Sequence, residues 1–259
     1  YEKVFNNKVA CELCPNKCII AEGKAGVCKV RRNVKGTLYS IIYENVTSIC
    51  MDPIEKKPLY HFFPGKEILS IGAIGCNLHC QFCQNWEISQ KEAPLYHITS
   101  EDIVNTAIKQ NSIGIAYTYN EPSIWHEFVI DTSIRAKENG LKNVLVTNGY
   151  INEEPLKKLL PYIDAMNIDI KSIEDKFYHK LTTAEIAPVL ETCKIASKQT
   201  HVEITNLVIP GENDTDQNFE ELSKWILENM GKDTPLHFSA YRPIYKMTTE
   251  ATPIETLLK

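Results

Sequence analysis

Most of the sequence alternates short apolar runs with longer amphipathic segments, and this alternation restricts the fold more than any other feature. The apolar runs, each of strand length, cover residues 67–75, 114–120, 142–149, 165–171, 201–210 and 236–243. Nearly continuous apolar runs are typical of parallel strands that are covered on both faces. Helical patterns lie between them, at residues 100–111, 124–139, 152–163, 175–181, 186–200 and 214–230. Because six β/α units are too few for the closed eight-stranded barrel, the pattern predicts an α/β fold, a partial (β/α)6 barrel.

Residues 1–67 do not follow this alternation. They contain four closely spaced cysteines, a short strand pair expected at residues 36–49, and a linker with several prolines. We therefore expect two domains. A small N-terminal Cys-rich metal-binding extension and its linker would occupy residues 1–67, and the partial-barrel core would occupy residues 68–259.

The composition narrows the class of partner. The 259 residues are 43% apolar, which is enough for a sizeable core without disulfides, and the net charge of −5 makes nucleic acid a poor candidate partner. No run approaches the roughly 20 apolar residues of a membrane span, and the first residues do not resemble a signal peptide. We therefore expect a cytoplasmic protein that does not bind a membrane.

Seven of the nine cysteines fall into two tight groups, which favours metal ligation over disulfides. The second group, Cys76, Cys80 and Cys83, follows the first predicted strand directly. Three thiolates from one loop can bind a 4Fe–4S cluster and leave one iron without a protein ligand. Zinc is the alternative metal, with His79 as a fourth ligand.

The first group supplies four cysteines, which are Cys11, Cys14, Cys18 and Cys28. Four thiolates saturate a tetrahedral site, so this metal is expected to be structural. We expect zinc or a second iron–sulfur cluster, with a loop that binds no metal as a third alternative, and the basic residues around this compact loop favour zinc. The histidines lack mutual metal-ligand spacing, and ordinary packing or surface roles are expected for His61, His97, His126, His179, His201 and His237.

Polar residues follow the ends of the predicted strands. They are Asn120, Glu121, Thr147, Asn148, Asp169, Lys171, Asn213, Asp214 and Arg242. In parallel α/β folds the loops after the carboxyl ends of the strands build the site. We therefore expect these side chains to meet at one mouth of the barrel, together with the second cysteine group.

These motifs resemble those of the radical SAM superfamily, and the chain as a whole is similar to its pyruvate formate-lyase activating enzymes and its AmmeMemoRadiSam subgroup. The matching segments are Cys76–Cys83 with the aromatic Phe82, Asn120-Glu121-Pro122 within the run of residues 117–122, Thr147-Asn148-Gly149, Asp169-Ile170-Lys171, Leu207–Gly211, residues 11–33 and residues 52–60. The resemblance implies a 4Fe–4S cluster that binds S-adenosylmethionine (SAM) at its open iron. It also implies reductive cleavage of SAM to a 5′-deoxyadenosyl radical, which abstracts hydrogen from a substrate.

The resemblance implies Cys76, Cys80 and Cys83 as the cluster ligands. It places Glu121 on the ammonium and Lys171 on the carboxylate of the methionine moiety. The full set that it implies for SAM is Phe82, Asn120, Glu121, Asn148, Asp169, Lys171 and Leu207. Three departures from the family pattern concern the substrate. Tyr119 and Asn120 replace paired glycines, Thr205 stands where activating enzymes tend to carry a base, and Arg242 falls where a histidine is common. No residue is singled out as a catalytic acid, base or nucleophile.

The resemblance also implies partners. A flavodoxin or ferredoxin would donate the electron, and a glycine Cα on a partner protein, or else a small molecule, would donate the hydrogen. A function of a different class stays open, since both cysteine groups could hold zinc in a non-catalytic binding module. The iron and sulfide content of the protein separates these alternatives.

Overall fold

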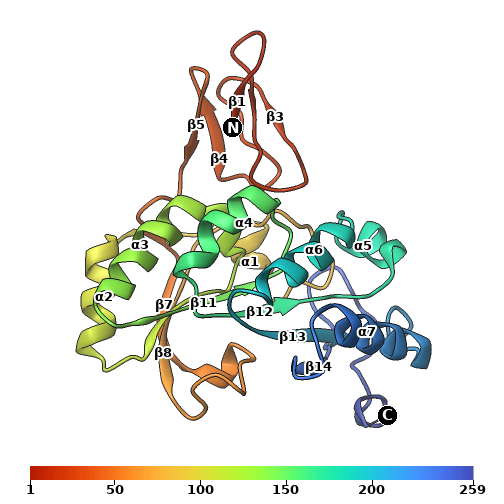
Figure 1. Ribbon diagram of the computed structural model, residues 1–259. Helices are drawn as coiled ribbons and strands as arrows, with labels where there is room; N and C mark the ends of the chain where they lie inside the picture. The colour runs from red at the N-terminus through yellow and green to blue at the C-terminus, as the bar shows by residue number, and fades with distance from the viewer. Residues whose placement is uncertain (259) are drawn as a thin grey trace.

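A seven-stranded sheet forms the centre of the computed structural model, which describes residues 1–258 (Figure 1). Its strands are β7 Ser48–Pro53, β8 Glu67–Gly72, β10 Gly114–Tyr117, β11 Lys142–Thr147, β12 Ala165–Asp169, β13 His201–Val208 and β14 Leu236–Ala240. Their order across the sheet is β14-β13-β12-β11-β10-β8-β7. β7 is antiparallel to β8, and the other neighbours are parallel. The six parallel strands are the six predicted apolar runs.

The helices that connect the parallel strands also follow the predicted segments. They are α2 Ser100–Lys109, α3 His126–Glu138, α4 Glu153–Leu159, α5 Asp175–Leu181, α6 Ala187–Ala196 and α7 Asp216–Asn229. The short helices α1 Trp86–Ser89 and α8 Ile254–Leu257 and the 3-10 turn η1 Ile54–Lys56 were not predicted. The 3-10 turns η2 Pro122–Trp125 and η3 Leu160–Tyr162 lie at the ends of the predicted segments 124–139 and 152–163. The helix ends are set locally, as at α2, where Thr99 and Asp102 form a reciprocal capping box.

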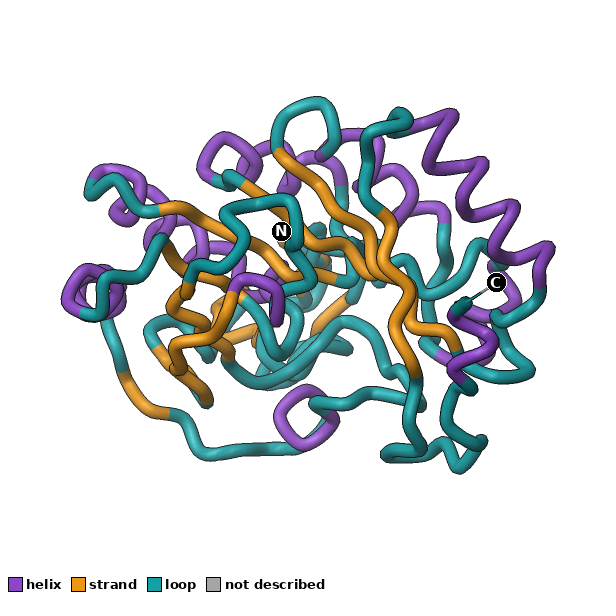
Figure 2. The backbone as a smooth tube through the Cα atoms, turned by 90° about the horizontal axis from the view of Figure 1, so that it is seen from below, coloured by secondary structure: helices purple, strands orange, loops and turns teal. Residues whose placement is uncertain are grey.

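The parallel strands lie in the sheet in the order of the sequence. Each crossover therefore advances in the same direction, and right-handed crossovers place the helices on one face. Figure 1 shows α3, α4 and α6 over this face, and the backbone trace in Figure 2 shows the strands in the interior with helices at the periphery. A sheet wound in this way curves toward a barrel, and β14 and β7 remain its two edges. The fold is the predicted partial (β/α)6 barrel.

The first 40 residues form a small lobe outside the main sheet (Figure 1). The lobe contains one antiparallel sheet of β1 Glu2–Lys3, β2 Val9–Ala10 and β3 Ile19–Ile20, and one hairpin of β4 Arg31–Val34 and β5 Thr37–Ser40. The strand pair expected at residues 36–49 is wrong, because β5 pairs with β4, and β6 Asn45–Val46 pairs with β9 Tyr96–His97. The domain division after residue 67 stays a prediction, although β7 joins the main sheet from the N-terminal side of it.

Strands β10 and β11 approach each other closely at Gly114. A Cβ atom at this position would lie 2.0 Å from the Lys142 carbonyl oxygen, so the strand pairing requires glycine here. Apolar side chains of the sheet and helices form one large buried cluster around this strand pair. Among residues 1–258, no helix combines the length and the apolar character needed to span a membrane.

We expect Gly114→Ala to lower the free energy of unfolding by about 3 kcal/mol, because the strands must separate to admit a methyl group. Gly140→Ala is the control, since Gly140 has a φ of +74° but nothing within 4 Å of the added Cβ atom. This variant should lose about 1 kcal/mol from backbone strain alone. Urea denaturation measures both values, and equal losses would show that the contact with β11 is unimportant.

Candidate functional site

A cavity of about 570 Å³ lies at the carboxyl ends of the parallel strands. Of the predicted site residues, it is lined by Cys76, Cys80, Phe82, Cys83, Asn120, Glu121, Thr147, Asn148, Asp169, Lys171 and Leu207. The structure therefore brings together the second cysteine group and polar side chains from the ends of successive strands. A cavity of this size can hold a drug-sized ligand.

The three cysteines come from the loop between β8 and α1. Burial raises the pKa of the Cys80 thiol to about 12 and also raises the pKa of Cys76. Such thiols hold their protons at neutral pH unless a cation stabilises the thiolates. Three thiols that line one cavity, and that ionise only beside a cation, match the thiolate ligands that an iron–sulfur cluster requires.

Asparagine side chains hold the backbone of this loop. The Asn120 Oδ1 accepts a hydrogen bond of 3.0 Å from the Ala73 N–H. Its Nδ2 donates to the carbonyl oxygens of Ile74 and Gly75, each at 3.1 Å. The polar atoms of the Asn120 side chain thus hold the backbone of residues 73–75, which lead directly to Cys76.

Glu121 is buried within the cavity wall, with 2% of its surface exposed. Its carboxylate accepts hydrogen bonds from the Ser123 N–H at 2.9 Å, the Thr147 hydroxyl at 2.7 Å and the Asn148 N–H at 2.8 Å. Burial raises the pKa of Glu121, and these three hydrogen bonds oppose the rise. These hydrogen bonds fix the direction in which the Glu121 carboxylate faces.

Lys171 supplies a buried cation to the lining of the same cavity. Its Nζ lies 2.5 Å from the Asp169 carboxylate and 5.7 Å from the centre of the Phe82 ring. Burial alone would lower the pKa of Lys171, but the nearby Asp169 and Cys80 raise it above the ordinary value. The cavity thus contains a fixed anion, Glu121, and a fixed cation, Lys171.

Three predicted strand-end residues do not line this cavity: Asn213, Asp214 and Arg242. Asn213 is 2% exposed and donates to the carbonyl oxygens of Lys171 and Leu207 at 2.6 and 2.9 Å, so it holds loops together. The prediction that all strand-end groups meet at one mouth is wrong for these three. The suggested zinc ligand His79 also lies outside the cavity lining, and its Nδ1 is 2.6 Å from the Gln90 Oε1.

The linker before β8 contributes side chains that sequence reasoning missed. Lys56, Lys57 and Pro58 line the cavity. Lys57 is 1% exposed, and its Nζ lies 2.7 Å from the Asp52 carboxylate. Burial lowers the pKa of Lys57, and Asp52 opposes that change. The two consecutive lysines could have indicated that this segment supplies positive charge to a site. They precede the first parallel strand, however, and site residues were expected only after strand ends.

The first cysteine group surrounds a second cavity. Cys11, Cys14, Cys18 and Cys28 line a space of about 10 Å³. Burial, together with the neighbouring cysteines, raises the pKa of the Cys14 thiol to about 12. The space is close to that of a single water-sized sphere. The structure therefore brings these four cysteines to one place, where they could hold a metal ion or a cluster.

The two cysteine groups are in contact through the protein backbone. A Cβ atom on Gly75, which has a φ of +86°, would lie 2.5 Å from the Cys28 carbonyl oxygen. The Asn16 side chain donates to the Asn77 carbonyl oxygen at 2.8 Å. The lobe that carries the first group thus packs directly on the loop that carries the second.

Comparison with known proteins gives one family. The sequence profile of the radical SAM superfamily matches residues 71–226. An uncharacterised protein of Methanocaldococcus jannaschii is 50% identical over 262 residues, which cover 99% of this chain and 78% of that protein. The pyruvate formate-lyase 1-activating enzyme of Escherichia coli K12 is 24% identical over 184 residues, which cover 66% of this chain and 73% of the enzyme.

Solved structures with low sequence identity share the fold. A structure of TYW1 with a lysine-pyruvate adduct bound has a TM-score of 0.59 at 14% identity, over 83% of this chain and 81% of that chain. Streptococcus suis SuiB bound to S-adenosylmethionine has a TM-score of 0.57 at 15% identity, over 74% of this chain and 46% of that chain. At these identities the likeness shows the fold alone.

We expect Asn120→Ala to lower the free energy of unfolding by about 2 kcal/mol, because the loop loses three hydrogen bonds. Amide hydrogen exchange should also become faster in residues 73–76. Asn139→Ala is the control, since Asn139 makes one exposed bond of 2.9 Å to the Arg135 carbonyl oxygen at the end of α3. Its effect should stay within about 0.5 kcal/mol. Unchanged exchange in the Asn120 variant would contradict the positioning role.

Proposed function

Because the chain belongs to the radical SAM superfamily, we propose that it is an enzyme that cleaves SAM reductively and abstracts hydrogen from a substrate. One observation carries the proposal: the three cysteines of one loop reach the same cavity as a buried carboxylate and a buried ammonium group. Cys76, Cys80 and Cys83 would hold the 4Fe–4S cluster. When bound, the cluster and SAM supply one-electron cleavage of a sulfonium C–S bond and a carbon radical.

The donor set of the cavity supports a cluster with one open iron. Within the described residues 1–258, the cavity lining contains three cysteines, no fourth cysteine and no histidine. A structural zinc site would need a fourth ligand. His79, the candidate for that ligand, is engaged with Gln90 instead. The lining therefore favours a cluster whose fourth iron binds a ligand that is not a protein side chain.

The charged residues of the cavity are suited to the amino-acid part of SAM. Glu121 would accept a hydrogen bond from the ammonium group, since its orientation is fixed by three donors. Lys171 would pair with the carboxylate, and Asp169 holds its ammonium in place. Phe82 presents an aromatic ring at the cavity wall, which would contact the adenine. Asn120, Asn148 and Leu207 would complete the binding site.

The partners follow from the activating-enzyme resemblance. We propose a flavodoxin or ferredoxin as electron donor, and a glycine Cα of a partner protein as the source of hydrogen. The E. coli relative is named as an activating enzyme for pyruvate formate-lyase 1, which supports a protein substrate. A small-molecule substrate is the alternative within the same chemistry.

For the first cysteine group we propose a single structural zinc ion. Cys11, Cys14, Cys18 and Cys28 line one small space, and the basic residues around this compact loop favour zinc over a second iron–sulfur cluster. Four thiolates complete its coordination, so no position is left for a substrate. The ion would fix the lobe that packs on the cluster loop.

Cys80→Ala should abolish formation of 5′-deoxyadenosine, because the cluster loses one of its three ligands. Cys50→Ser is the matched control, since Cys50 is exposed on β7 and does not line the cavity. After anaerobic reconstitution with iron and sulfide, the wild type and Cys50→Ser should contain about four irons in this cluster and form 5′-deoxyadenosine with SAM and dithionite. Protein that contains two zinc ions and no sulfide would instead be the non-catalytic module.

Cys14→Ala should remove the N-terminal zinc and lower stability by about 3–4 kcal/mol, because the bound ion stabilises the folded lobe. Zinc analysis and chemical denaturation measure the two effects, with Cys50→Ser again as the control. The yield of 5′-deoxyadenosine per folded, cluster-loaded chain should be retained. A loss of turnover at unchanged stability would contradict the structural role and indicate electron relay through this site.

A further inference from the structure

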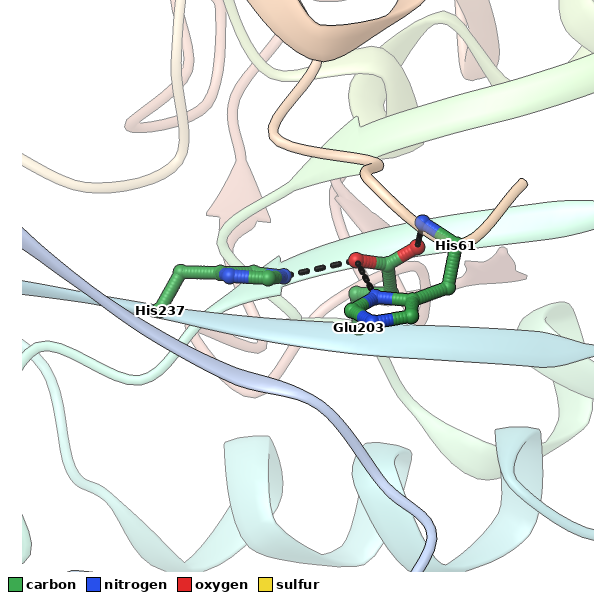
Figure 3. Close-up of side chains that lie close together, drawn as sticks. All are labelled: His61, Glu203 and His237. Atoms are coloured by element: carbon green, nitrogen blue, oxygen red, sulfur yellow. Dashed lines mark hydrogen bonds and ion pairs between the residues drawn. The ribbon is translucent and has the colours of Figure 1, made fainter. Parts of the chain in front are cut away.

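Two histidines and one glutamate from distant parts of the sequence converge beside the main cavity. Glu203 lies on β13, His237 on β14, and His61 in the linker between η1 and β8. Figure 3 shows both imidazole rings directed at the same carboxylate. The Glu203 Oε2 lies 2.6 Å from the His237 Nε2 and 3.3 Å from the His61 Nδ1. One ligand atom from each residue lies within 4.8 Å of the other two.

The carboxylate of this cluster is held rigidly. The Tyr60 N–H donates to its Oε2 at 3.0 Å, and the His61 N–H donates to its Oε1 at 2.8 Å. The His201 Nε2 lies 2.9 Å from the Oε1. The Oε2 is therefore presented to His61 and His237, and backbone and second-sphere contacts fix its direction.

The charge of this carboxylate has no permanent partner. The Glu203 side chain is fully buried, at 0% exposure, and no lysine or arginine of residues 1–258 forms an ion pair with it. Its three imidazole neighbours supply positive charge only when they are protonated. Buried charges in proteins are normally paired or bound to a metal. A divalent cation would supply the missing charge while the imidazoles stay neutral.

We propose that His61, Glu203 and His237 form a binding site for a first-row divalent transition-metal ion such as Zn²⁺ or Fe²⁺. Two imidazole nitrogens and one carboxylate oxygen are the donors that these ions share. Bond lengths of about 2.0–2.1 Å place neighbouring donors about 3.3 Å apart around a tetrahedral ion. The His61 to Glu203 distance, 3.3 Å, already has this value, and the His237 contact would open from 2.6 Å.

The site is open to solvent on one side. The His61 side chain is 62% exposed and the His237 side chain is 20% exposed, so an ion can enter. Three protein ligands leave at least one coordination position for water. The site is separate from both cysteine groups, because none of its ligands lines either of their cavities.

The ion would also position part of the main cavity. Thr205 and Ser239, two residues along the same strands from Glu203 and His237, line that cavity. Lys57 and Pro58, just before His61, line it too. A metal bound by all three ligands would tie this linker to β13 and β14, and so hold the lysine wall of the cavity in place.

Zinc binding by the full chain tests the proposal independently of SAM cleavage. The cluster is reconstituted and the N-terminal site is filled, and the protein is then dialysed against micromolar Zn²⁺. We expect the wild type to bind one zinc more than the N-terminal site holds. His61→Ala and His237→Ala should weaken this extra binding at least about tenfold. The zinc X-ray absorption spectrum of the wild type minus that of His61→Ala should show nitrogen and oxygen neighbours around the extra zinc, and no sulfur neighbour.

His179→Ala is the matched control, because His179 forms a histidine–carboxylate pair of 2.8 Å with Asp175 on the exposed surface of α5. This variant should keep the extra zinc. The His61 side chain is 62% exposed and the His237 side chain only 20%, so His61→Ala disturbs packing less and decides the result if His237→Ala fails to fold. Absence of the extra zinc in the wild type, or equal binding by His61→Ala, would overturn the proposal. Loss of 5′-deoxyadenosine formation with zinc binding intact would affect the proposed function alone.

Discussion

The loop that carries Cys76, Cys80 and Cys83 has little regular structure, and its position depends on hydrogen bonds from other parts of the chain. Asn120, at the end of the second parallel strand, binds three backbone groups of this loop. The Asn77 side chain donates to the Tyr150 carbonyl oxygen at 2.6 Å, beyond the third strand. The sheet therefore sets where the thiols lie, because it fixes the two strand ends that hold the loop.

The parallel sheet could be predicted because its strands are buried on both faces and read as continuous apolar runs. β7 could not, since its residues Ser48–Pro53 are mostly exposed or half-buried and carry no such run. Its place is decided by pairing along the edge of β8, which is a contact across the linker. For the same reason, the pairing of β6 with β9 was missed: each strand has two residues, and the paired residues are 50 and 52 positions apart.

The site was predictable where residue type and spacing act together, as in the three cysteines and the groups that end the second, third and fourth strands. Position at a strand end does not say where a side chain points, and Asn213 turns to bind backbone carbonyls instead. The cluster of His61, Glu203 and His237 gave no signal, because its members come from three unrelated segments. Ordinary packing or surface roles were expected for the two histidines, and only the folded chain brings them to one carboxylate.

Gly75 joins the small lobe to the barrel at a place where no side chain fits. A Cβ atom there would lie 2.5 Å from the Cys28 carbonyl oxygen. The lobe is therefore not an interchangeable module that could be grafted onto any related barrel. A recipient with a side chain at this position would hold the lobe away from its loop. During evolution, the lobe and this single glycine therefore have to be kept together.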